Sequence, residues 1–160
     1  MTASYVKPCR ERLEALLEEG AIEAAVLCTA DGLAVAHAGE AGESERVAAM
    51  SASMLALGDA MIGGGDGEAA ECRQVVVEAD GRVMTLIHAG ENMALAVTGA
   101  ADATLGMVLG RARRAADELV AIVAESSDAA EIEEHGQPTG ASLEELVQRV
   151  LREAAEARGG

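Results

Sequence analysis

The sequence predicts an α/β (α+β) sandwich built on a five-stranded antiparallel sheet. Two Asp-Gly pairs, at residues 31–32 and 80–81, each separate two apolar runs, which is a strong signal for a β-hairpin. Helical periodicity precedes, separates and follows these hairpins, and gives the order α-ββ-α-βββ-α. The strand runs are apolar on both sides, so we expect helices on both faces of the sheet. A further amphipathic helix is predicted at the C-terminus.

The first helix is expected at residues 10–19, with Pro8 in its first turn and Gly20 just after its end. The first hairpin follows, with strands at 24–29 and 33–38. In the second of these strands, Leu33 and Val35 share one face. The other face consists of alanines, which would allow a helix to approach closely.

The stretch 47–62 predicts a helix that is apolar on more than one side. One row of apolar side chains comprises Val47, Met50, Met54, Leu57 and Met61. A second row comprises Ala48, Ala52, Leu55 and Ile62. A domain of this size has one sheet to cover one row, so we expect the other row to meet a second chain, most simply a second copy. The alternative is a helix buried within one monomer.

Four glycines among residues 63–67 predict a hinge, because the Lys-Ser/Thr pair and the following helix of a phosphate-binding loop are absent. A three-stranded meander is expected over 74–79, 82–89 and 93–98, and then a helix over 103–125. Within that helix Arg113 and Asp117, like Arg114 and Glu118, are four residues apart and can form ion pairs. An anion-binding role for these arginines is the alternative.

The predicted domain therefore spans residues 1–125. Residues 126–141 are polar and are expected to form a linker. Residues 142–160 are expected to form a helical tail, since Ser142 and Glu145 have the spacing of a capping box and an apolar stripe follows them.

The composition excludes several classes of partner. The formal net charge of −16 disfavours nucleic acid and anionic membranes, and no stretch is apolar enough to enter a bilayer. No signal peptide is apparent. The three cysteines form no CxxC motif, which indicates reduced thiols and a cytoplasmic protein.

No catalytic set is apparent, and no cofactor or metal site is predicted. His37, His88 and His135 lack the spacing of metal ligands. Cys28 in a strand fits a buried structural thiol better than a nucleophile. The two aspartates of the Asp-Gly pairs are turn residues.

The motifs together resemble the Roadblock/dynein light chain family. The resemblance rests on AAVLCTADGLAVAHAG, on ERVAAMSASMLALGDAM, and on the meander and helix from QVVVEADGRV to RRAADEL. It covers about residues 20–119. It implies a non-enzymatic α/β sandwich that dimerises through the helix at 47–62 and edge to edge through the strand at 74–79. The implied interface residues are Val47, Met50, Met54, Leu57, Met61, Val75, Val76 and Val77.

The resemblance also implies a function, because many family members bind small Ras-like GTPases and one bacterial relative resembles a GTPase-activating partner. We transfer that role to the outward side of the helix pair, with Arg46, Ser53, Met50 and Met54 as contacts. A structural adaptor that binds partners through the C-terminal helix is the main alternative. A small-molecule sensor is a weaker one, since the chain lacks the aromatic lining usual in ligand pockets.

Overall fold

The computed structural model describes residues 4–40, 43–63, 71–134 and 151–157. The elements, in chain order, are α1 (Val6–Glu18), β1 (Ile22–Thr29), β2 (Ala34–Gly39), α2 (Ser44–Gly63), β3 (Gln74–Ala79), β4 (Arg82–Ala89), β5 (Met93–Gly99) and α3 (Leu105–Glu134). Residues 151–157 are also helical. The predicted fold class and element order are confirmed. The chain divides into two units, Met1–Ser127 and Asp128–Gly160.

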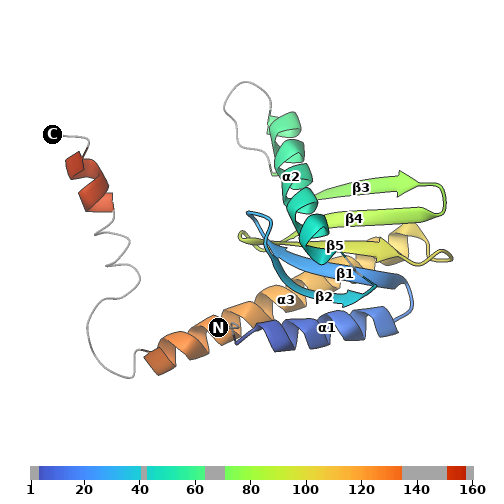
Figure 1. Ribbon diagram of the computed structural model, residues 1–160, viewed down its shortest axis with the longest axis horizontal. Helices are drawn as coiled ribbons and strands as arrows, with labels where there is room; N and C mark the ends of the chain where they lie inside the picture. The colour runs from blue at the N-terminus through green and yellow to red at the C-terminus, as the bar shows by residue number, and fades with distance from the viewer. Residues whose placement is uncertain (1–3, 41–42, 64–70, 135–150, 158–160) are drawn as a thin grey trace. The chain divides into compact units, whose positions relative to one another are not determined.

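The five strands form one antiparallel sheet in the order β2-β1-β5-β4-β3. The pairing of β1 with β5 joins the hairpin to the meander, and Val26 lies opposite Ala96 at its centre. This arrangement leaves β2 and β3 as the two edge strands (Figure 1).

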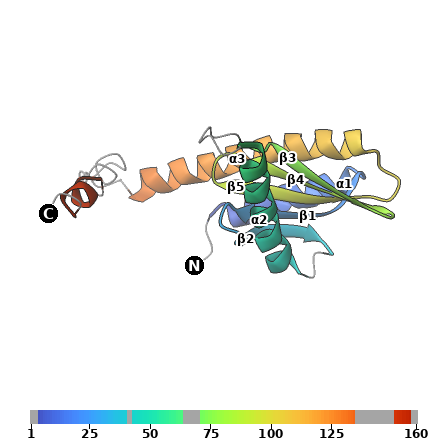
Figure 2. The same ribbon diagram turned by 90° about the horizontal axis from the view of Figure 1, so that it is seen from above.

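The helices cover both faces of this sheet, α2 on one face and α1 with α3 on the other (Figures 1 and 2). The α1/α3 side holds the larger buried cluster, which includes Leu13, Leu27, Leu95 and Leu119. The α2 side holds a smaller cluster, built from Val26, Cys28, Ala48, Leu55, Leu86, Ala94 and Ala96. Of the alanines predicted to share one face of β2, Ala36 and Ala38 are buried in the α1/α3 cluster, whereas Ala34 is exposed.

The Asp-Gly turns set the ends of the hairpin strands. Gly81 has a φ of 74°, and the two-residue turn leaves Ala79 paired with Arg82. The other turn is longer than predicted. The Thr29 hydroxyl accepts a hydrogen bond from the Leu33 N–H at 3.0 Å, so that Leu33 belongs to the turn and β2 begins at Ala34.

The predicted end of the last helix is wrong. We expected it to stop at residue 125, before a linker at 126–141, but α3 continues to Glu134. Its final residues include Ala and Glu, which are strong helix formers, and no Gly or Pro occurs between Gly110 and Gly136. The glycines at 64–67, the rest of the linker and residues 142–150 of the tail lie outside the described residues.

The arginines of α3 do not pair within their own helix as predicted. Among the described residues, the ion pairs contain neither Arg113 with Asp117 nor Arg114 with Glu118. Glu118 pairs instead with Arg12 of α1, and Arg111 donates a hydrogen bond to the Glu19 carbonyl. These contacts fasten α1 to α3. Within the described residues, no helix has both the length and the apolar character needed to cross a membrane.

Candidate protein-interaction surface

Helix α2 meets the sheet with the side that lies between the two apolar rows. Ala48, Ser51 and Leu55 are buried there, while Val47 and Met54 are half-buried against the same cluster. The buried Ser51 hydroxyl donates to the Val47 carbonyl of the preceding turn at 2.6 Å, so it needs no partner in the sheet.

The opposite side of α2 is apolar and exposed. Met50, Leu57 and Met61 are 54%, 61% and 76% exposed, and the alanines at 49, 56 and 60 are exposed too. We call this row the α2 outer face. The structure thus divides the first predicted row, with Val47 and Met54 toward the sheet and the other three residues outward.

The β1–β2 turn lies directly against α2. A Cβ atom added to Gly32 would lie 3.0 Å from the Ala49 Cα and 3.5 Å from the Ala52 Cβ. Gly32 also has a φ of 91°, a conformation that L side chains rarely adopt. The turn can approach α2 this closely because Ala49 and Ala52, the helix residues next to Gly32, have small side chains. The exposed Leu33 follows immediately and adds to the apolar surface.

Strand β3 presents the second part of the surface. Its only partner in the described chain is β4, so the N–H and C=O groups along its outer edge are unpaired by any strand. Val75 packs against the α2 cluster, Val76 is half-buried and Val77 is 39% exposed. No proline or lysine protects this edge.

The C-terminal end of α2 is fixed to the start of β3. Asp59 Oδ1 accepts a hydrogen bond from the Cys72 N–H at 2.5 Å. Gly58 permits this approach, because a Cβ there would lie 2.7 Å from Cys72 Sγ. His88 Nε2 of β4 lies 3.9 Å from Asp59 Oδ1. These contacts join the C-terminal end of α2 to the start of β3, next to the α2 outer face and the β3 edge.

The predicted partner contacts lie at the N-terminal part of α2. Arg46 is exposed and pairs with Glu43 at 2.6 Å, and it borders a hollow of about 280 Å³ whose floor includes Val47, Met84 and Ala96. Ser53 is exposed, and its hydroxyl donates to the Ala49 carbonyl of its own helix at 3.0 Å. Met50 is close to both along the helix, whereas Met54 is turned toward the sheet.

The candidate nucleophile Cys28 has the surroundings of a structural thiol. It is fully buried, and burial raises the pKa of its thiol, although a hydrogen bond with the Ala94 backbone acts in the opposite direction. Asp31 lies in its turn, where a hydrogen bond from the Thr29 side chain lowers the pKa of the carboxyl. His135 lies outside the described residues. No cluster of three possible metal ligands occurs within the part of the chain that the structure describes.

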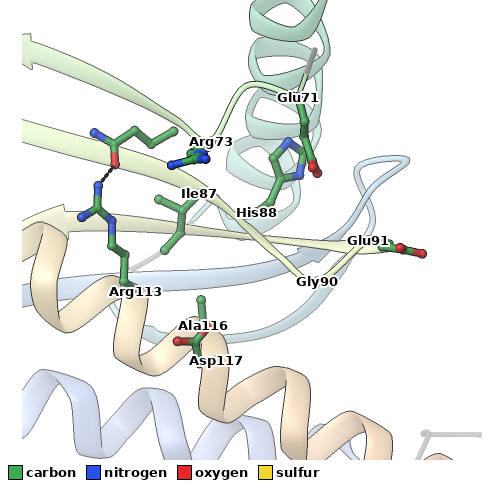
Figure 3. Close-up of a pocket in the computed structure, with 10 residues that line it drawn as sticks. Glu71, Arg73, Ile87, His88, Gly90, Glu91, Arg113, Ala116 and Asp117 are labelled. Atoms are coloured by element: carbon green, nitrogen blue, oxygen red, sulfur yellow. Dashed lines mark hydrogen bonds between the residues drawn. The ribbon is translucent and has the colours of Figure 1, made fainter. Parts of the chain in front are cut away.

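A second hollow, of about 590 Å³, lies where β3 begins beside β4 and α3 (Figure 3). Its lining is mixed in charge, with Arg73 and Arg113 opposed by Glu71, Glu91 and Asp117, and it also includes His88. Arg113 Nη2 donates to the Gln74 side-chain oxygen at 2.5 Å, which links α3 to the edge strand. Sequence reasoning missed this contact, because nothing in the sequence places β3 beside α3.

The family model of the Roadblock/LC7 domain matches residues 10–98, more than half of the chain. The chain belongs to the Roadblock/LC7 domain family. This confirms the family that the sequence resembled. No curated protein sequence matches the chain.

Solved structures share the fold at low sequence identity. "MglB with tetrameric arrangement" is 24% identical with a TM-score of 0.67, and the match covers 79% of this chain and 95% of that one. MglB of Myxococcus xanthus is 20% identical with a TM-score of 0.69 and the same coverage. A Roadblock/LC7 domain from Streptomyces avermitilis is 24% identical with a TM-score of 0.62, over 69% of this chain and 92% of that one.

Proposed function

We propose that the protein is a non-enzymatic, dimeric regulator or scaffold that binds a small Ras-like GTPase in the cytoplasm and modulates its GTP turnover. The observation that carries this proposal is the α2 outer face beside the edge of β3, an apolar surface that the described residues of the unit Met1–Ser127 leave exposed and unpaired. Membership of the Roadblock/LC7 family and the fold shared with MglB support the GTPase as the partner class.

The dimer uses the α2 outer face and the β3 edge together. Met50, Leu57 and Met61 of one copy pack on those of the other, and the two β3 strands pair so that one sheet runs through the dimer. Val47 and Met54 support this contact from the sheet side of the helix, and Val75, Val76 and Val77 supply the strand. An edge without charged or proline protection favours such pairing.

The GTPase binds on the N-terminal part of the α2 pair. Arg46, Ser53 and the part of Met50 that the dimer leaves accessible form the contact, next to the hollow that Arg46 borders. We infer that binding reshapes the GTPase rather than supplying an arginine to its nucleotide, since Arg46 is already paired with Glu43.

The first experiment measures the oligomeric state by light scattering. We expect twice the chain mass of 16.3 kDa. A monomer at all concentrations would remove the dimer from the proposal.

The second experiment combines a pull-down with a GTP-turnover assay, using the small GTPase encoded by a neighbouring gene. We expect nucleotide-dependent binding and a changed turnover rate. Arg46→Ala should weaken binding without abolishing the effect on turnover at saturating protein. If saturating Arg46→Ala protein no longer changed the GTP turnover rate, Arg46 would be an arginine donated to the nucleotide. Absence of binding between the original chain and the GTPase in either nucleotide state would exclude the function.

A structural adaptor remains the second candidate. Residues 151–157 form a helix, and Leu151 is 57% exposed on it. Deletion of residues 142–160 would then abolish capture of the partner but leave the dimer intact. A regulator that works through α2 alone would keep its GTPase after the same deletion.

A further inference from the structure

The hydrogen-bonding pattern of β3 defines which residues its free edge offers. The two-residue turn closes on the pair Ala79 and Arg82, whose backbone groups bond to each other across the turn. Bonded and non-bonded pairs alternate along an antiparallel ladder, so residues 75, 77 and 79 direct their N–H and C=O groups toward β4. The outward-facing backbone groups therefore belong to Gln74, Val76 and Glu78.

The same three residues share one face of the sheet. Val75 packs on the α2 side, so its neighbours at 74, 76 and 78 have their side chains on the α3 side. The hydrogen bond between Gln74 and Arg113 of α3 agrees with this assignment. The described ion pairs contain neither Arg113 nor Glu78, and both residues are exposed.

Symmetry restricts how two β3 strands can pair. This step rests on the proposed dimer, in which one sheet continues through a two-fold axis. Each outward-facing residue must meet an outward-facing residue of the other copy, so even-numbered residues lie opposite even-numbered ones and odd-numbered residues opposite odd-numbered ones. The register that places Val76 opposite Val76 is one of two that align five residues of the strand with five of the second copy, the other being the register that places Val77 opposite Val77. The register centred on Val76 also sets Val75 against Val77 of the second copy, and Gln74 against Glu78 of the second copy.

We propose that the interface has the register centred on Val76 and that Arg113 forms an ion pair with Glu78 of the second copy, twice in each dimer. Arg113 is already held at the Gln74 side chain, and the residue opposite Gln74 in a bonded pair is about 5.5 Å away between Cα atoms. Arg113 and Glu78 thereby make the edge selective for a second copy of this chain.

Shifts of the register by two residues lose these contacts. In one direction Glu78 would face Val76 of the second copy, and Gln74 would face Asp80 in the turn. In the other direction Gln74 would face Val76 and Glu78 would face Cys72, outside the strand. Either shift places a carboxylate beside an apolar or short side chain instead of beside an arginine.

Charge exchange tests the ion pair. Arg113→Glu alone and Glu78→Arg alone each create two like-charge contacts, so we expect the homodimer dissociation constant to rise about tenfold or more, measured by analytical ultracentrifugation. An equimolar mixture of the two single variants should form heterodimers preferentially, because each contact then joins opposite charges. The double variant should dimerise as the original chain does. Circular dichroism checks that both single variants stay folded.

Cysteine cross-linking tests the register. Under oxidation Val76→Cys should give a disulfide-linked dimer, because the two copies of residue 76 lie opposite each other. The matched variant Val77→Cys should not, because the two copies of residue 77 lie diagonally across the strands, about 7–8 Å apart. If the original chain dimerises but the charge variants do not differ from it, or if Val77→Cys cross-links instead, this interface is wrong while the proposed dimer stands. A monomeric original chain would overturn both.

Discussion

At the residue scale, Gly32 determines how the first hairpin meets α2. We predict that Gly32→Ala destabilises the protein by about 2 kcal/mol or more, since it adds a contact of 3.0 Å with the Ala49 backbone to the cost of a positive φ. Gly81→Ala is the matched control, because its φ is also positive but no atom lies within 4 Å of the added Cβ. Its cost should be about 1 kcal/mol. Urea unfolding measures both, and equal losses would contradict the proposed close approach.

Asp31 provides a pH-dependent contact in the same turn. A hydrogen bond from the Thr29 side chain lowers the pKa of this carboxyl in the folded state, so its contribution to stability is present above the carboxyl's unfolded pKa and is lost as the pH falls through the folded pKa. In an NMR titration, Thr29→Val should return the pKa toward its ordinary value, and Thr29→Ser should leave it low. A value unchanged by Thr29→Val would assign the shift to the backbone.

At the element scale, α2 divides into a side that packs on the sheet and a side that is apolar and exposed in the single chain. We predict that Leu57→Glu leaves a folded monomer, because Leu57 is exposed in the single chain and a charge there disrupts an apolar contact between copies. Met107→Glu is the control, since Met107 is also exposed and apolar but lies on α3. It should remain dimeric. Light scattering with circular dichroism tests both, and a Leu57→Glu dimer would place the interface elsewhere.

The sequence predicted the ends of those elements whose ends are set by neighbouring turn residues. The bounds of β3 and β4 match the prediction, because the Asp-Gly pair fixes the turn between them. The end of α3 was missed, since the polar residues after Glu125 indicated a linker although they are compatible with a helix.

Long-range arrangement was less accessible to the sequence. The resemblance implied that the β3 edge is shared, but the residues of β3 do not show that β1 pairs with β5 and leaves β3 at the edge. The apolar rows of α2 predicted two partners for the helix. They did not predict its rotation, in which Ser51 faces the sheet. Ser51 is polar but can be buried there, because its hydroxyl bonds to its own helix.

At the scale of the whole molecule, the dimer should depend on residues 1–125 alone. We predict that deletion of residues 142–160 leaves the dissociation constant and the thermal midpoint of the dimer unchanged, because the α2 outer face and β3 both belong to the unit Met1–Ser127. Analytical ultracentrifugation and circular dichroism provide the measurements. A monomer after deletion would assign the tail a part in assembly.

The unequal size of the two hydrophobic clusters has a consequence for dynamics. The described core has seventeen buried residues on the α1/α3 side and seven on the α2 side, so α2 is anchored by far less buried surface. The proposed dimer would cover the outer face of α2, and association stabilises the folded state of the region that it buries by mass action. Hydrogen exchange at α2 amides should therefore slow as the protein is concentrated, while amides facing the larger cluster keep their rates. Dilution would then increase hydrogen exchange in α2 before it does so in the rest of the domain.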